Sequence, residues 1–116
     1  MILPSDFEES EQPDSVEFQL ADGIFVKSGH FARAGRIVPQ HAHEHDHSSF
    51  IATGGALAWS GDEFLGTFDA PCSIFIKAKV KHTFKTTKDN TLILCIHNVS
   101  RTGLVDIHEL HEVRFP

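Results

Sequence analysis

The chain has 116 residues, 41% of them apolar, which is enough for one domain with a single hydrophobic core. Its 10 Lys and Arg against 16 Asp and Glu give a net charge of −6, which disfavours nucleic acid and anionic membranes as partners. We find no transmembrane run and no secretion signal, so we expect a cytoplasmic protein. Cys72 and Cys95 lie in apolar runs that suit buried thiols, although one disulfide remains an alternative.

Residues 1–20 are expected to form a loose acidic arm. The segment from Pro4 to Asp14 is rich in Ser, Pro and Glu and has few apolar residues. Such a segment buries too little surface to order itself strongly. We therefore place the start of the folded domain at residue 21.

From Ile24 onward the sequence is typical of an all-β protein. Short stretches rich in Phe and β-branched residues alternate with Gly, Pro, Asp or Asn, and no persuasive helical stripe of apolar residues is present. The predicted strands are Ile24–Lys27, His30–Ala34, Ile37–His43, Ser48–Thr53, Ala56–Ser60, Glu63–Phe68, Ser73–Ile76, His82–Thr86 and Thr91–Val99. The tail from Leu104 to Val113 is predicted as a last strand or a short helix.

Three turns between these strands contain residues that tolerate positive φ. They are Gly54-Gly55, Ser60-Gly61-Asp62 and Lys88-Asp89-Asn90, and we interpret each as a hairpin turn. Consecutive hairpins indicate an antiparallel meander or a jelly roll.

The chain contains nine histidines, four of which lie between His41 and His47. An unbroken strand rises about 3.3 Å per residue, so its ends would lie roughly 20 Å apart, too far for one metal ion. If the strand runs straight only through His41 and His43, both imidazoles point to one face, because side chains alternate. A turn at residues 44–46 then returns His47 on the next antiparallel strand, facing the same pair. The best candidate for a fourth ligand is His82, at the start of an apolar strand.

This spacing resembles a known motif. The order is Gly35, five residues, His41-Ala42-His43, three residues, His47, six residues and Gly54. It resembles the first motif of the cupin family, except that His47 stands at the position where that family usually has Glu.

The segment from Ile74 to Phe84 is similar to the second cupin motif, with His82 at its histidine position. Lysines replace the usual Pro and Gly, and Thr86 stands where Asn is common. The resemblance covers residues 35–99 and implies a single-domain antiparallel jelly-roll β-barrel over residues 21–103, followed by the tail of residues 104–116. It also implies a homodimer formed through edge strands.

The replacement of Glu by His47 has a chemical meaning. Neutral imidazoles leave the full charge on a divalent ion, which makes that ion a stronger Lewis acid. We therefore predict one divalent transition metal, with zinc or iron favoured and nickel, copper or manganese as alternatives. Ligation by His41, His43, His47 and His82 would leave one or two positions for water or a substrate.

Other residues receive less direct roles. His45 is expected to face solvent from its turn. His97 is the candidate catalytic residue, as an acid, a base or a partner of a metal ligand, although for it and His30 a structural role is the alternative. The predicted cavity walls are Phe50, Phe75 and Phe84. Tyrosine is absent, so proton transfer falls to His, Glu or Asp.

Three functions follow as hypotheses, since fold membership alone does not select a reaction. The first is a metal-dependent enzyme on a small anionic or enediol-like substrate. Iron would permit dioxygen chemistry, and zinc or nickel would favour isomerase, cyclase or lyase chemistry. The second is a noncatalytic ligand-binding or sensing module stapled by its metal, and the third is a metal-free assembly component.

Overall fold

The computed structural model describes residues 13–41, 47–77, 79–98, 104–108 and 111–114, and the side chains among residues 13–38, 48–77 and 79–98. This part of the chain contains no helix long and apolar enough to cross a membrane. The strands in it are β1 (Ser15–Ala21), β2 (Ile24–Phe31), β3 (Ile37–His41), β4 (His47–Thr53), β5 (Gly55–Ser60), β6 (Glu63–Asp69), β7 (Cys72–Ile76), β8 (His82–Thr86), β9 (Thr91–Asn98), β10 (Leu104–His108) and β11 (His111–Arg114).

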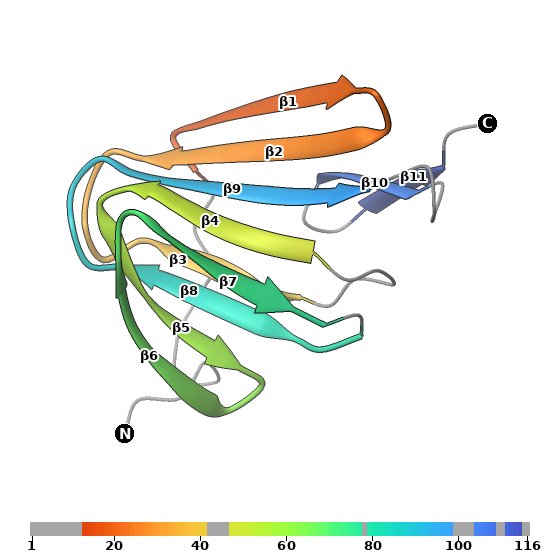
Figure 1. Ribbon diagram of the computed structural model, residues 1–116. Coiled ribbons are helices and arrows are strands. Elements are labelled where there is room, and N and C mark those ends of the chain that lie inside the picture. The colour runs from red at the N-terminus through yellow and green to blue at the C-terminus, as the bar shows by residue number, and fades with distance from the viewer. Residues whose placement is uncertain (1–12, 42–46, 78, 99–103, 109–110, 115–116) are drawn as a thin grey trace.

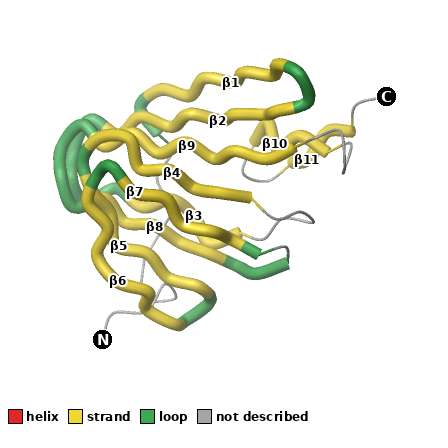
Figure 2. Tube along the Cα trace, in the orientation of Figure 1, coloured by secondary structure: helices red, strands yellow, loops and turns green. Residues whose placement is uncertain are grey.

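Two antiparallel sheets lie face to face (Figure 1). The five-stranded sheet has the order β1-β2-β9-β4-β7, and the four-stranded sheet has the order β3-β8-β5-β6. The strands β10 and β11 form a separate hairpin. This arrangement confirms the predicted all-β, antiparallel jelly roll. Its strands run between two groups of turns at opposite ends of the barrel (Figure 2).

Three predicted elements differ from the structure. The expected loose arm of residues 1–20 includes most of β1, because alternating Val16, Phe18 and Leu20 let this segment pair with β2 along its length. The two strands expected around Gly29 are one strand, since β2 is bonded on both sides and needs no turn there. Of the two alternatives predicted for the tail, the strand is found, although the tail forms two strands, β10 and β11, instead of one.

Only one of the three predicted hairpin turns joins neighbouring strands. The turn at residues 60–62 connects the paired strands β5 and β6. The turns at residues 54–55 and 88–90 instead carry the chain from one sheet to the other, because β4 and β5, and likewise β8 and β9, belong to different sheets. The residues there do adopt the expected backbone, with φ of 76° at Gly54 and 55° at Asn90.

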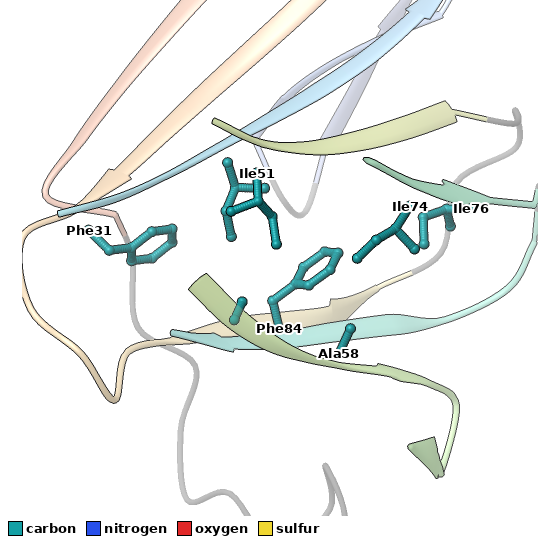
Figure 3. Close-up of a cluster of buried hydrophobic side chains, with 8 residues drawn as sticks. Phe31, Ile51, Ala58, Ile74, Ile76 and Phe84 are labelled. Carbon is teal, nitrogen blue, oxygen red and sulfur yellow. The ribbon is translucent and has the colours of Figure 1, made fainter. Parts of the chain in front are cut away.

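The hydrophobic core lies between the two sheets (Figure 3). The five-stranded sheet contributes Phe31, Ile51, Ile74, Ile76 and Ile93, and the four-stranded sheet contributes Ala56, Ala58 and Phe84. Each large aliphatic or aromatic side chain buried in this way stabilises the fold by about 1.5–3 kcal/mol. We call the face of each sheet that carries these residues its inner face.

At one end of the barrel, which we name the Thr86 end, threonine hydroxyls form hydrogen bonds with backbone groups of the turns. The Oγ1 of Thr86 accepts a hydrogen bond from the Arg36 amide at 2.9 Å and donates one to the Arg33 carbonyl at 3.1 Å. The Oγ1 of Thr91 donates to the Lys88 carbonyl at 2.8 Å. Both threonines are at most 2% exposed. These bonds satisfy turn groups that would otherwise be buried without partners.

Candidate metal centre

The opposite end of the barrel contains His82 and the ends of strands β3 and β4 at His41 and His47, and we name it the His82 end. In the pairing of β3 with β8, His41 and His82 are Cα partners. Residues directly opposite in an antiparallel pair lie within about 5.5 Å of each other at Cα. The register therefore brings together two histidines that are 41 positions apart in the sequence.

His82 is buried within the barrel wall. Its side chain is 1% exposed, and its ring meets the edge of Phe84 with centroids 5.6 Å apart and an angle of 69° between the planes. Because Phe84 belongs to the core, His82 lies on the inner face of the four-stranded sheet. An imidazole nitrogen is one of the commonest metal ligands in proteins.

His47 begins β4, and this strand lies in the five-stranded sheet. Our expectation that His47 sits on a strand next to that of His41 is therefore corrected, because β3 and β4 belong to opposite walls of the barrel. In the pairing of β4 with β9, Ser48 is the Cα partner of Ile96. His47 precedes Ser48 and His97 follows Ile96, so both histidines lie at the His82 end of their strands.

His97, the candidate catalytic residue, lies at the His82 end of β9. It is 7% exposed, and its ring centroid lies 5.3 Å from that of Phe25, its Cα partner on β2. The register thus places His97 on the inner face, beside the start of β4.

The remaining predicted ligands fall outside what the structure describes. His43 and His45 lie outside the described residues, and the side chains of His41 and His47 lie outside those described. Among the side chains that are described, no three of His, Cys, Asp or Glu form a metal-binding group. The support for the four-histidine set is therefore the sequence spacing, together with the backbone positions of His41, His47 and His82.

The predicted cavity walls separate into two groups. Phe84 is 1% exposed and lies on the inner face. Phe75 is 62% exposed and lies between the buried Ile74 and Ile76, so it points to the outer face of its strand. Phe50 alternates in the same way, since its neighbour Ile51 is in the core. The expectation that these two phenylalanines line the cavity is thus corrected by strand alternation.

The two cysteines form no disulfide with each other, and both are half-buried rather than fully buried as expected. Burial, with a smaller contribution from the negative charge of Asp69, raises the pKa of the Cys72 thiol. Cys72 starts β7 and so belongs to the Thr86 end. Cys95 lies on β9, where its Sγ is 3.7 Å from the Ser49 Oγ.

Comparison with known proteins places this architecture among the cupins. No protein-family model matches the chain, and no curated protein resembles it in sequence. Solved structures do match. A cupin 2 conserved barrel domain protein from Rhodopseudomonas palustris gives a TM-score of 0.65 at 18% identity, over 93% of this chain and 71% of that one.

Two further structures agree. An RmlC-like cupin with a double-stranded β-helix fold, from Methanocaldococcus jannaschii, gives a TM-score of 0.65 at 13% identity, covering 79% of this chain and 85% of that one. KdgF from Halomonas sp. gives 0.62 at 14% identity, covering 70% and 74%. The protein therefore has the double-stranded β-helix fold. More specifically, it has the fold of the small, single-domain cupin-2 proteins.

Proposed function

We propose that this protein is a metal-binding cupin that acts on a small anionic or enediol-like substrate at an all-histidine centre. The observation that carries the proposal is the pairing of His41 with the buried His82, at the end of the barrel where His47 and His97 also lie. Two walls of the barrel thus bring histidines toward one place. The cupin fold and the histidine spacing support the same conclusion.

The residues present fit a divalent transition metal. His41, His43, His47 and His82 would hold it, since neutral imidazoles suit zinc, iron, nickel and copper. Once bound, the ion would supply Lewis-acid or redox chemistry to a chelating substrate. The protein's own contributions are a dry inner face around Phe84 and a proton-accepting imidazole at His97.

Elemental analysis of untagged protein tests the proposal. We expect about one transition metal ion per chain, and an alanine substitution at His41, His43, His47 or His82 should lower that content severely. His30→Ala is the matched control, because His30 lies toward the Thr86 end of β2 and alternates to the face opposite the buried Phe31. A metal-free wild-type protein, or equal loss from His30→Ala, would contradict the proposal.

The variant His47→Glu tests the meaning of the all-nitrogen ligand set. It restores the residue that the cupin motif usually has, and its oxygen donor should keep the metal bound. Because oxygen ligands suit manganese better than imidazoles do, we expect the ratio of manganese to zinc affinity to rise. Competitive loading followed by elemental analysis measures that ratio. An unchanged ratio would mean that residue 47 is not a ligand.

A noncatalytic role is the second candidate. His41 and His47 lie on strands of opposite sheets, so a metal bound to both would staple the barrel. In that case a chelator lowers the melting temperature, while the loaded protein binds no small acid. Measured binding of a small acid to the metal-loaded protein would favour the first candidate.

We also propose a homodimer. The edge strand β1 exposes Val16, Phe18 and Leu20 by 39%, 44% and 45%, and these side chains alternate onto one face. The same strand of a second copy could pair with β1 edge to edge about a two-fold axis, so that the two rows pack side by side. Light scattering should give twice the chain mass for the wild type and the monomer mass for Phe18→Glu. A monomeric wild type would contradict the proposal.

A further inference from the structure

One charged side chain lies in the inner face of β2. Residues at alternate positions of this strand share a face, and three of those on the inner face, Phe25, Gly29 and Phe31, are buried. The fourth member of the row is Lys27, which is half-buried. A lysine is an unusual residue in such a row, because lysines are mostly exposed in folded proteins.

The strand register confirms the face on which Lys27 lies. Its Cα partner on β9 is Cys95, and directly opposite residues share a face of the sheet. The Sγ of Cys95 lies 3.7 Å from the Oγ of Ser49, which is 0% exposed. Lys27 therefore belongs to the same side of the sheet as the core.

Lys27 also lies close to the His82 end. The adjacent row of the same face contains Phe25 and its Cα partner His97, which lies at the His82 end, as does His47. On β1, the Cα partner of Lys27 is Phe18, whose ring stacks on Phe25 with centroids 6.0 Å apart. The lysine is thus bordered by aromatic rings, a thiol and an imidazole.

Among the described side chains of residues 13–38, 48–77 and 79–98, no ion pair involves Lys27. The ion pairs among these side chains join Arg36 to Asp14 and Lys88 to Asp69, and both lie at the Thr86 end. The residues across from Lys27, Phe18 and Cys95, carry no carboxylate. A half-buried lysine in such surroundings is a suitable site for an anion from solution.

We propose that Lys27 is an anion-binding residue that holds a carboxylate of a small organic acid on the inner face of the five-stranded sheet, next to the His82 end. This inference deepens the proposed function, on which it rests for the location of the acid's other end at the histidine centre. It selects as substrate class small acids that have a chelating group and a separate carboxylate. The simplest such compounds are dicarboxylates.

Calorimetric titration of malonate into the zinc-loaded, full-length protein tests the assignment. Lys27→Met keeps a long apolar side chain but removes the charge, and we expect it to raise the Kd for malonate about tenfold or more. Lys27→Arg should stay within about threefold of the wild type, since it retains a charged donor. Lys88→Met, which removes a lysine from the Thr86 end, should leave the Kd unchanged.

Three results would overturn the inference. They are an equal Kd for wild type and Lys27→Met, an equal loss in Lys88→Met, and the absence of malonate binding to the wild type. Zinc content, measured separately for each variant, keeps this test distinct from that of the proposed function. If the wild type holds no zinc, the metal proposal fails. The comparison of wild type with Lys27→Met on the metal-free protein then still decides the role of Lys27.

Discussion

At the Thr86 end of the barrel, turn amides and carbonyls are bonded to buried hydroxyls. At the His82 end, strands β3, β4 and β8 begin or end at histidines, and the half-buried Lys27 lies nearby on β2. The same strands reach both ends of the barrel, so the two ends share one hydrophobic core. The core therefore does not explain how the ends differ. What differs is the kind of polar group: hydroxyls bonded to turn backbone at one end, and imidazoles and a lysine at the other. Buried hydroxyls bonded to backbone groups stabilise a fold, whereas imidazoles and ammonium groups are the side chains that we propose for ligand binding.

Two glycines with positive φ, one at each end, provide the most severe test of this difference. A Cβ at Gly54 would lie 2.7 Å from the Thr91 Cα, whereas a Cβ at Gly61 would meet nothing within 4 Å. Both substitutions to Ala strain the backbone by about 1–2 kcal/mol, but only Gly54→Ala also forces two chain segments apart. We expect Gly54→Ala to cost about 4 kcal/mol or more in the free energy of unfolding.

Urea denaturation of both variants measures the two costs. If Gly61→Ala lowers the free energy of unfolding as much as Gly54→Ala does, the close approach of Gly54 to Thr91 contributes nothing to stability. The proposed difference between the two ends would then be wrong.

Two threonines on β8 give a test of intermediate size. Thr86 lies at one end of the strand with its hydroxyl bonded to Arg36 and Arg33. Thr83 lies next to His82, and its equally buried Oγ1 has no hydrogen-bond partner in the described part of the structure. Thr86→Val leaves two backbone groups unsatisfied and should destabilise the fold by about 2 kcal/mol, whereas Thr83→Val removes only an unbonded hydroxyl.

We expect Thr83→Val to be neutral or to stabilise the fold by about 1 kcal/mol. Thermal denaturation of both variants checks the sign. A loss of stability in Thr83→Val equal to that in Thr86→Val would show that the hydroxyls at the two ends contribute alike.

The smallest effect is expected at Asp14. The hydrogen bond from the Ala32 amide at 2.7 Å lowers the pKa of this carboxyl below its usual 3.8, and the positive charge of Arg36 lowers it further. A lowered pKa in the folded state stabilises the protein above the pKa of the unfolded state. This stabilisation is lost as the pH falls through the lower, folded-state pKa.

Asp14→Asn should therefore be slightly less stable than the wild type at pH 7, and the gap should close on acidification below pH 3.8. Thermal denaturation of the wild type and Asp14→Asn between pH 7 and pH values below 3.8 measures this difference in stability. A gap that stays constant with pH would mean that the charge of Asp14 contributes nothing.

Local sequence signals predicted most strands correctly, because turn residues and apolar stretches act within a few positions of the chain. They did not predict which strands would be neighbours. Whether His47 faces His41 from an adjacent strand or from the opposite wall depends on β4 pairing with β7 and β9, which are distant in sequence. No property of residues 41–47 alone contains that information.

Lys27 shows a second reason for an incomplete prediction. Its place on the inner face follows from the alternation of Phe25, Lys27, Gly29 and Phe31, which is visible in the sequence. The predicted strands ended at Lys27 and began again at His30, which divided this alternating pattern into two parts. The glycine is instead an ordinary member of β2, bonded on both sides.

The two glycines of the histidine motif lie at the Thr86 end, far from the histidines between them. Gly35 donates its amide to the Thr86 carbonyl at 2.7 Å, and Gly54 packs against Thr91. In this motif the chain runs along the barrel in β3, with five residues between Gly35 and His41, and returns in β4, with six residues between His47 and Gly54. The number of residues in each strand therefore determines how far along the barrel His41 and His47 lie. An insertion in β3 would displace His41, and one in β4 would displace His47, although neither insertion changes a histidine.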